Sequence, residues 1–335
     1  MPKVIAEIGV NHNNSKKLGK ELINQAKKIG ASSVKFQTFK AKTLASKNTP
    51  KVPYQKNNKK ESHYEMLKKL ELSEKDHLFY QNICKKLKIE FISTPYTLED
   101  AKFLSELKLK TIKTASADIV DHKLHQYLSL KKAKVIISTG MASIKEIDET
   151  LKIYKKNKKK NIILLHCVSN YPCSDKSLNL RNIITLKERY DFPIGFSDHS
   201  RDEKAAVIAL SFGARIFERH FTMNKNLNGP DHKASSDPKE LKNYFNTLSR
   251  SLIMLGNYQK KLQKEERDMK KISRKSLIYN RSLPAGTKIN LEYLDCRRPG
   301  TGVLPNKISW IKGKIIKKKV KVDQFVKFSD FSLKK

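Results

Sequence analysis

The chain is 335 residues long, contains four cysteines and carries a formal net charge of +37, and these properties exclude several classes of protein. The cysteines form no Cys-x-x-Cys pair, so a disulfide framework is not expected. No apolar run approaches the roughly 20 residues of a membrane-spanning helix, and the strand-like N-terminus does not resemble a signal peptide. We therefore expect a cytoplasmic protein with no membrane partner.

The positive charge raises the possibility of a nucleic-acid-binding protein, because clustered lysine and arginine neutralise phosphates. The basic residues are nearly all lysines, however, and they are spread along the chain in groups such as Lys16-Lys17 and Lys155 to Lys160. No basic segment alternates with stacking aromatic residues. A solvated lysine-rich surface without a nucleic-acid partner is therefore favoured, and a non-enzymatic polyanion-binding protein is the remote alternative.

Short apolar runs alternate with longer helical patterns from Val4 to His220, which predicts eight strand–helix units. The predicted strands are Val4–Ile8, Ser33–Thr38, Glu90–Thr94, Thr111–Ala115, Val135–Ser138, Ile162–His166, Ile194–Ser197 and Arg215–His220. The predicted helices between them include Ser15–Ile29, Glu74–Leu87, Leu98–Leu107, Ile144–Tyr154 and Asp202–Phe212. Eight such units fit an α/β fold of the closed (β/α)8 or TIM-barrel type, with an open doubly wound sheet as the alternative.

The chain changes character after the eighth strand. A helix is predicted at Leu241–Leu255 and is followed by a charged connector, and short β-prone runs broken by Pro and Gly begin near Ser273. We therefore predict a barrel at residues 1–256, a linker at 257–272 and a small β-rich domain at 273–335. The long segment from Lys42 to Glu61 shows no pattern of regular structure, and loops of that length in compact domains are usually functional.

Active sites of (β/α)8 barrels lie at the C-terminal ends of the strands, where this chain is polar at nearly every strand. The polar strand-end residues are Glu7, Lys35, Gln37, Ser93, Thr94, Lys113, Ser116, Ser138, Thr139, His166, Ser169, Ser197, Asp198, His199, Glu218 and His220. The lysines and hydroxyls would bind a phosphate and a carboxylate. Glu7 and the nearby Asp231 would handle protons or sugar hydroxyls.

Two histidines, His199 and His220, each end a short apolar run with one predicted helix between them. Because neighbouring parallel strands lie about 4.8 Å apart, the two imidazoles could converge on one divalent ion. Imidazole ligands alone admit Mn²⁺, Co²⁺ or Zn²⁺. We expect His166 to be a structural core histidine and Cys167 to fill the core, and the role of His232 is left open.

Several motifs occur in an order that resembles the sialic acid synthase family, which includes the bacterial N-acetylneuraminate and legionaminate synthases. They are Ala6-Glu-Ile-Gly-Val-Asn-His-Asn13, Val34-Lys-Phe-Gln-Thr38, Lys113-Thr-Ala-Ser116, His166-Cys-Val-Ser-Asn-Tyr-Pro172, Gly195-Phe-Ser-Asp-His199, Glu218-Arg-His-Phe-Thr222 and Gly229-Pro-Asp-His232. The tail resembles that family's SAF (antifreeze-like, β-clip) domain, most clearly at Arg297-Arg-Pro-Gly-Thr-Gly302. The resemblance covers essentially the whole chain.

This resemblance implies a transferase that condenses phosphoenolpyruvate with an open-chain N-acetylated amino sugar, giving a nine-carbon 2-keto sugar acid and phosphate. The acceptor would be N-acetylmannosamine, giving N-acetylneuraminate. The alternative is 2,4-diacetamido-2,4,6-trideoxymannose, giving N,N'-diacetyllegionaminate. The stretch from Tyr54 to Met66 resembles these two branches of the family more than the pseudaminate branch, and does not choose between them.

The resemblance also assigns roles to residues. Phosphoenolpyruvate would be bound by Lys35, Gln37, Thr94, Lys113, Ser116, Ser169 and Ser197. The catalytic groups would be Glu7, Asp231 and Lys113, and the sugar would contact Asn58, Tyr171 and Arg298. His199 and His220 would bind the divalent ion, usually Mn²⁺ in the family, with Mg²⁺ or Co²⁺ as alternatives. Arg298 would reach the active site of the partner subunit, in a homodimer with swapped SAF domains.

Overall fold

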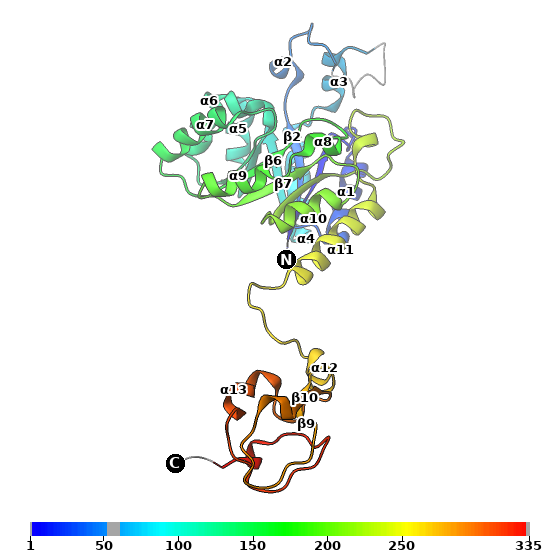
Figure 1. Ribbon diagram of the computed structural model, residues 1–335. Helices are drawn as coiled ribbons and strands as arrows, with labels where there is room; N and C mark the ends of the chain where they lie inside the picture. Colours follow the sequence, from blue (N-terminus) through cyan, green and yellow to red (C-terminus); the bar gives the residue numbers. More distant parts are fainter. Residues whose placement is uncertain (1, 52–60, 333–335) are drawn as a thin grey trace. The chain divides into compact units, whose positions relative to one another are not determined.

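The structure is a computed structural model and describes residues 2–51 and 61–332 (Figure 1). Eight parallel strands, hydrogen-bonded in chain order, close into a barrel, as predicted. Their bounds lie within one residue of those predicted from the sequence. The strands are β1 (Lys3–Gly9), β2 (Ser33–Thr38), β3 (Glu90–Pro95), β4 (Thr111–Thr114), β5 (Lys134–Ser138), β6 (Ile162–Cys167), β7 (Ile194–Asp198) and β8 (Ile216–His220).

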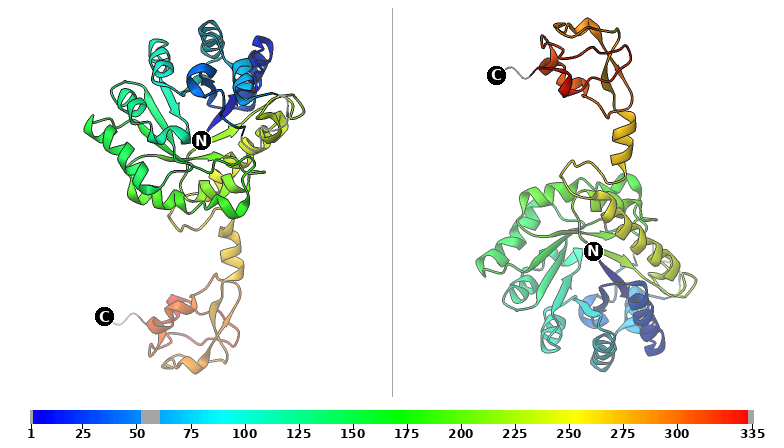
Figure 2. Two further views of the ribbon diagram at one scale, coloured as in Figure 1. Left: turned by 90° about the horizontal axis from the view of Figure 1, so that it is seen from above. Right: turned by 90° about the horizontal axis from the view of Figure 1, so that it is seen from below.

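Helices surround this barrel on its outside (Figure 2). They are α1 (Lys16–Ile29), α4 (Glu74–Leu87), α5 (Leu98–Glu106), α6 (His122–Ser129), α7 (Ile144–Lys156), α8 (Asp175–Leu178), α9 (Asn182–Arg189), α10 (Lys204–Ser211) and α11 (Pro238–Leu255). Helices α4, α7 and α11 begin with capping boxes, built for α7 by Ser143 and Glu146. A side-chain cap of this kind stabilises a helix by about 1 kcal/mol, so the sequence fixes where these helices start.

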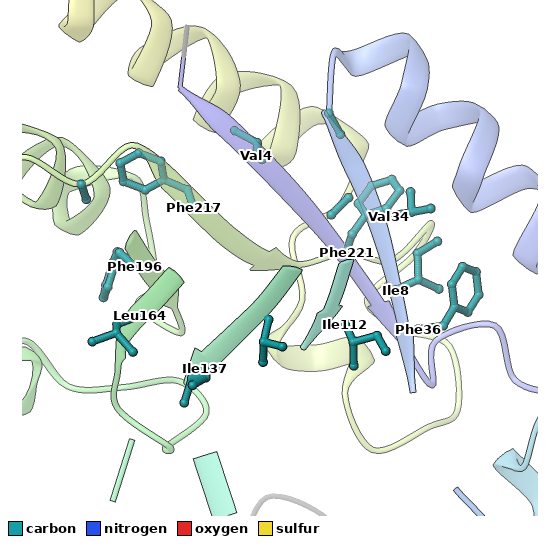
Figure 3. Close-up of a cluster of buried hydrophobic side chains, with 14 of the residues drawn as sticks. Val4, Ile8, Val34, Phe36, Ile112, Ile137, Leu164, Phe196, Phe217 and Phe221 are labelled. Atoms are coloured by element: carbon teal, nitrogen blue, oxygen red, sulfur yellow. The ribbon is translucent and has the colours of Figure 1, made fainter. Parts of the chain in front are cut away.

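The outward-facing side chains of the strands form the main hydrophobic core with the helices. This core includes Val4, Ile8, Val34, Phe36, Ile112, Ile137, Leu164, Phe196, Phe217 and Phe221 (Figure 3). The inward-facing side chains at the lower part of the barrel form a second, smaller cluster. It consists of Ile5, Ile92, Ile136, Ile163, Leu165 and Ile216, and we call it the barrel plug. Successive side chains of a strand point to opposite faces, so β1, β3, β5, β6 and β8 contribute to both clusters.

The connection between β2 and β3 carries two short helices, α2 (Ala41–Leu44) and α3 (His63–Leu70). The expectation of a patternless segment from Lys42 is therefore wrong at its start. The physical reason is tertiary packing, because Ala41 and Leu44 pack with Met66, Leu67 and Leu70 of α3 in a small apolar cluster apart from the two barrel clusters. A single helical turn is too short to show a period in the sequence.

The chain divides into two compact units, Met1–Gly256 and Asn257–Lys335. The second unit begins with α12 (Glu266–Ser273), which lies within the segment expected to be a connector. It continues with an antiparallel pair, β9 (Ser276–Tyr279) and β10 (Leu294–Arg297), followed by the short helix α13 (Ile308–Ile311). Its core is separate from that of the barrel and includes Leu277, Tyr279, Val320 and Phe331.

Among the described residues, no helix combines the length and the apolar character needed to cross a membrane.

Candidate active site

A cavity of about 490 Å³ opens at the C-terminal ends of the barrel strands. Its lining includes all the predicted site residues of the barrel unit that lie in the described part of the chain: Glu7, Lys35, Gln37, Thr94, Lys113, Ser116, Ser169, Tyr171, Ser197, His199, His220 and Asp231. The volume falls in the range of pockets that hold small ligands, about 300–1,000 Å³. The barrel therefore brings together side chains that are spread over more than two hundred residues of sequence.

Two of the predicted site residues do not belong to this group. Asn58 lies outside the described residues. Arg298 follows β10 in the second unit, where it is exposed to solvent.

The deepest part of the cavity holds two buried lysines. The Nζ atom of Lys35 lies 2.8 Å from Oε1 of Glu7 and donates a hydrogen bond to Oγ1 of Thr94 at 3.1 Å. The Nζ atom of Lys113 lies 3.3 Å from Oε1 of Glu218. Buried lysines are rare unless they are paired, so these contacts explain how the fold tolerates both cations above the apolar plug.

Glu218 is the central carboxylate of the cavity, although the sequence analysis assigned it no role beyond a polar strand end. It accepts a hydrogen bond from Oγ of Ser197 at 3.1 Å and lies near both lysines, at 3.3 Å from Lys113 and 3.9 Å from Lys35. Its second oxygen, Oε2, has no hydrogen-bond partner among the described residues. The sequence could have identified Glu218, because it lies two residues before His220 on β8 and residues two apart in a strand face the same side.

Among the residues that the structure describes, three carboxylates line the cavity, and the two that lie beside the lysines, Glu7 and Glu218, have pKa shifts of opposite sign. Burial raises the pKa of Glu7 to about 7, and repulsion from Glu218 adds to the effect of burial while Lys35 opposes it. Burial also acts to raise the pKa of Glu218, but attraction to Lys113 and Lys35 outweighs it and lowers the pKa to about 2. Near neutral pH the cluster therefore contains two ammonium groups against one full and one partial negative charge. This charge deficit favours an anionic ligand.

Hydroxyl groups from the loops after β4 and β6 form a second part of the cavity. Oγ of Ser116 accepts a hydrogen bond from the backbone N–H of Gly140 at 3.2 Å. A Cβ atom at Gly140 would lie only 2.6 Å from Oγ of Ser169 and 2.7 Å from Oγ of Ser116. Glycine is therefore required here for the two hydroxyls to approach the backbone so closely, an arrangement suited to the oxygens of a phosphate or carboxylate.

The imidazoles of His199 and His220 stand side by side at the rim, with their ring centroids 5.6 Å apart. Nδ1 of His199 lies 2.7 Å from the carbonyl oxygen of Val168. Since a carbonyl only accepts, Nδ1 carries the hydrogen, and in the neutral ring Nε2, which lies 3.5 Å from Oγ of Ser197, keeps the lone pair that a metal ion needs. Burial lowers the pKa of His220 well below its usual value, with repulsion from His199 adding to the effect, so this ring is neutral.

These two imidazoles fit a divalent ion as a pair of nitrogen ligands. Nδ1 of His220 is buried without a hydrogen-bond partner among the described residues, and Oδ2 of Asp231 lies 3.9 Å from it. No group of three or more His, Cys, Asp or Glu side chains in residues 2–51 and 61–332 is arranged to hold a metal ion. An ion bound here would therefore keep open positions for substrate or water.

Several polar strand-end residues face away from this cavity. Ser93 hydrogen-bonds to Thr38, Asp198 pairs with Arg219, and Nε2 of His166 bonds to the carbonyl oxygen of Leu178 at 2.8 Å. The prediction that the polar strand ends line the active site is wrong for Ser93 and Asp198, because their side chains point outward toward the helices. The expectation that His166 is structural agrees with its place in the fold.

Two further expectations concern Cys167 and His232. Cys167 is buried as expected, but it lines the cavity, and its Sγ lies 3.8 Å from Nδ1 of His199. His232 is fully buried outside the cavity lining, between Oγ1 of Thr222 at 2.7 Å and Oδ1 of Asn13 at 3.2 Å. It therefore fixes the loop that carries Asp231.

A closed parallel barrel with buried lysines and a pair of imidazoles at the C-terminal strand ends defines a (β/α)8-barrel enzyme with a site for a small anionic ligand. Comparison with known proteins identifies the family. The NeuB family matches residues 22–260, and the SAF domain matches residues 274–332.

The chain is 43% identical to an N,N'-diacetyllegionaminic acid synthase of Legionella pneumophila, over 92% of this chain and 89% of that protein. It is 38% identical to the N,N'-diacetyllegionaminic acid synthase of Campylobacter jejuni, over 97% of this chain and 98% of that protein. A solved N-acetylneuraminic acid (sialic acid) synthetase from Leptospira borgpetersenii has a TM-score of 0.72 and 33% identity, covering 80% of this chain and 90% of that one. The chain belongs to the NeuB family of sialic-acid-type synthases and carries a C-terminal SAF domain.

Proposed function

We propose that this protein condenses phosphoenolpyruvate with an open-chain N-acetylated amino sugar and water, releasing a nine-carbon 2-keto sugar acid and inorganic phosphate. The observation that carries the proposal is the buried pair Lys35 and Lys113, which lies in the same cavity as the imidazoles of His199 and His220. The two lysines face one fully charged carboxylate, Glu218, and one partly charged carboxylate, Glu7, and this balance suits an anionic enol phosphate. The imidazole pair suits the second reactant, an aldehyde.

The anion would be held at both ends. Lys113 and Lys35 would pair with its carboxylate and phosphate, and the hydroxyls of Thr94, Ser116, Ser169 and Ser197 would donate to the remaining oxygens. Gln37 lies beside Glu7, to which its Nε2 donates at 3.2 Å, so its contact with the anion would be at the edge of the cluster. Fixing two reactants in one geometry can lower the barrier by roughly 7–11 kcal/mol.

His199 and His220 would hold the divalent ion, for which Mn²⁺ is the first candidate and Mg²⁺ or Co²⁺ are alternatives. A bound ion of this kind acts as a Lewis acid that polarises a carbonyl oxygen. Tyr171 packs its ring 4.0 Å from the ring of His199 and 5.4 Å from that of His220, measured between centroids. It would keep both imidazoles in place and form one side of the sugar site.

The reaction forms one C–C bond and replaces the C–O bond to phosphate with a C–O bond to the oxygen of water. The methylene carbon of the enol phosphate attacks the aldehyde carbon, and water then adds at the carbon that carried the phosphate, which leaves as inorganic phosphate. Asp231, whose Oδ2 lies 3.9 Å from Nδ1 of His220, would give a proton to the aldehyde oxygen. Glu7, which contacts Lys35, would take a proton from the attacking water.

The identity of the sugar divides the proposal into two candidates. The greater identity to two N,N'-diacetyllegionaminic acid synthases favours 2,4-diacetamido-2,4,6-trideoxymannose. The similarity to a solved sialic acid synthetase supports N-acetylmannosamine, the acceptor that the sequence resemblance placed first.

Arg298 enters the proposal through the second unit. We expect the chain to act as a homodimer in which Arg298 of one SAF domain binds the acetamido group in the partner's barrel. Arg298→Ala should then raise the sugar KM, and mixing it with a Lys113→Ala variant should restore part of the activity, because one of the two sites in a mixed dimer is intact. If each SAF domain serves its own subunit, mixing will restore nothing.

The test of the function is release of inorganic phosphate from phosphoenolpyruvate in the presence of Mn²⁺ and each candidate sugar. N-acetylmannosamine 6-phosphate and arabinose 5-phosphate serve as controls for a synthase that uses phosphorylated sugars. Turnover with either unphosphorylated acetamido sugar supports the proposal. Turnover only with a phosphorylated sugar, or with none of the four, contradicts it.

A further inference from the structure

The candidate cavity has two chemically different sides. The barrel side carries the charged and hydroxyl groups described above. The other side is apolar and is built by the connection between β2 and β3 together with residues that follow β1, β2 and β3. It consists of Val10, Phe39, Leu44, Ala45, Met66, Leu67 and Leu70, and we call it the apolar wall.

The apolar wall is a packed structure with its own small core. Met66, Leu67 and Leu70 are successive buried positions of α3, each less than a tenth exposed, and Phe39 is 3% exposed. Helix α2 packs against α3, and the capping box of Ser62 and Glu65 fixes the first turn of α3. This cluster is distinct from the main barrel core. Its apolar side chains nevertheless line the same cavity as the catalytic groups.

Among the described residues, Thr49, His63 and Tyr96 also line this side of the cavity. Oγ1 of Thr49 is already engaged with Oγ of Ser46 at 3.1 Å, and Nδ1 of His63 is buried without a hydrogen-bond partner among the described residues. A ligand hydroxyl directed at Met66 or Leu67 would lose its water partners without gaining a partner from either side chain, and an unpaired buried polar group is unfavourable. A methyl group in the same place would gain from burial.

The two candidate sugars differ at the end remote from the aldehyde. N-acetylmannosamine carries hydroxyls on carbons 4 and 6, whereas the diacetamido-trideoxy sugar carries an acetamido group on carbon 4 and a methyl at carbon 6. With the aldehyde at His199 and His220, after β7 and β8, the far end of the sugar would reach the apolar wall, which stands after the neighbouring strands β1 and β2 and lines the same cavity.

We infer that the apolar wall is the specificity element of the site, and that it selects an acceptor whose remote end carries a methyl group at carbon 6 in place of the hydroxyl. The inference rests on the proposed function. It assigns Met66 and Leu67 as the residues that distinguish the diacetamido-trideoxy sugar from N-acetylmannosamine. A methylene or hydroxyl difference in an apolar pocket discriminates by roughly 10- to 200-fold.

The experiment compares kcat/KM for the two sugars in the wild-type enzyme and in Met66→Gln, which has a similar side-chain volume but introduces an amide. The wild type should prefer the diacetamido sugar by about 100-fold. Met66→Gln should reduce that preference about tenfold through the sugar KM, with the KM for phosphoenolpyruvate unchanged. Leu67→Gln is the second variant. Met66→Leu, which keeps the wall apolar, should retain the preference.

Leu78→Gln is the matched control, because Leu78 is a leucine on α4 that is 46% exposed and lies outside the cavity lining. It should leave both sugars unaffected. Equal or better wild-type turnover of N-acetylmannosamine overturns the inference. So does an equal loss on both sugars, or an unchanged preference in both glutamine variants. Turnover with either sugar supports the proposed function whatever the preference, and phosphate release with neither sugar refutes both.

Discussion

Two buried ion pairs share strand β8, one facing the helices and one facing the cavity, and they differ in whether a ligand can reach them. The outward pair joins Asp198 and Arg219 at 3.1 Å. Arg219 also donates to Oγ of Ser236 at 2.9 Å and lies over the ring of Tyr244, while Asp198 accepts from the backbone N–H of Ser200. This guanidinium has a full set of neighbours.

The inward pair joins Lys113 and Glu218 at 3.3 Å, and Glu218 must also serve Lys35 at 3.9 Å. Its Oε2 atom has no hydrogen-bond partner among the described residues. The charged side chains of both pairs are buried to a similar extent, so burial alone does not identify a functional residue. Oδ2 of Asp198 also has no hydrogen-bond partner among the described residues, so unpaired oxygens do not separate the two pairs either. The difference is that Lys35, Lys113 and Glu218 line the cavity, where a ligand can contact them, whereas Asp198 and Arg219 do not.

The largest effect is expected when substitutions of an inward histidine, His199, and an outward histidine, His166, are compared. His199→Ala should abolish both metal retention and turnover, because it removes one of the two imidazole ligands. His166→Gln should keep the metal, because that ring only bonds to the carbonyl of Leu178. Metal content by elemental analysis of the purified protein decides the question. Unchanged metal in His199→Ala would reject the ligand assignment.

Lys113→Met should lower kcat/KM by about 10²–10³-fold, the usual effect of losing one preorganised electrostatic group. The KM for phosphoenolpyruvate should rise, and Tm should change little, since Glu218 keeps its contacts with Lys35 and Ser197. Steady-state kinetics together with a thermal melt measure both effects. A large fall in Tm with retained activity would mean that the inward pair is structural.

Arg219→Met should have the opposite effects to Lys113→Met: a lower Tm and nearly unchanged kinetic constants. Removing one partner of a buried pair costs about 3–5 kcal/mol of stability, or a fall in Tm on the order of 10 °C. The kinetic constants of the protein that remains folded should stay within a few-fold of the wild type. A loss of activity that exceeds the loss of folded protein would contradict the structural role assigned to the outward pair.

Asp118, which follows β4, should have a smaller and pH-dependent effect on stability. Burial, with repulsion from Asp121, raises its pKa from 3.8 to about 7 against the attraction of Lys113. The folded protein therefore binds this proton more tightly than the unfolded chain. The resulting stabilisation is complete below the unfolded pKa and is lost as the pH rises through about 7.

Asp118→Asn should consequently melt near the wild-type temperature at pH 4. At pH 8 it should melt above the wild type, by roughly 2–4 °C for each kcal/mol that the charged form loses. Melting curves of both proteins across this range provide the measurement. A constant difference between the two would show that Asp118 has an ordinary pKa in the folded state.

The sequence predicts the eight strands because each is a short apolar run bounded by helical patterns, and a barrel leaves little freedom once the strands are set. The histidine pair and the lysines could also be predicted, since they sit at strand ends. What the strand ends do not reveal is which way a side chain faces. Ser93 and Thr94 are equally polar neighbours, but only Thr94 reaches the cavity.

Two other features depend on contacts that no local pattern expresses. Glu218 becomes the central carboxylate only because β4 and β2 place Lys113 and Lys35 beside it. The apolar wall forms because Met66 and Leu67 on α3 meet Phe39 after β2, across a connection whose sequence shows no regular period. In both cases the signal is long-range packing, which propensity and spacing do not report.

The barrel plug has a consequence for the order of events. Ile5, Ile92, Ile136, Ile163, Leu165 and Ile216 fill the lower barrel, so the lysine cluster is reached only through the mouth where the sugar would sit. For the proposed reaction, phosphoenolpyruvate would have to enter first, and phosphate would have to leave past the newly made nine-carbon product. The kinetics should then follow a compulsory order, in which phosphoenolpyruvate binds before the amino sugar.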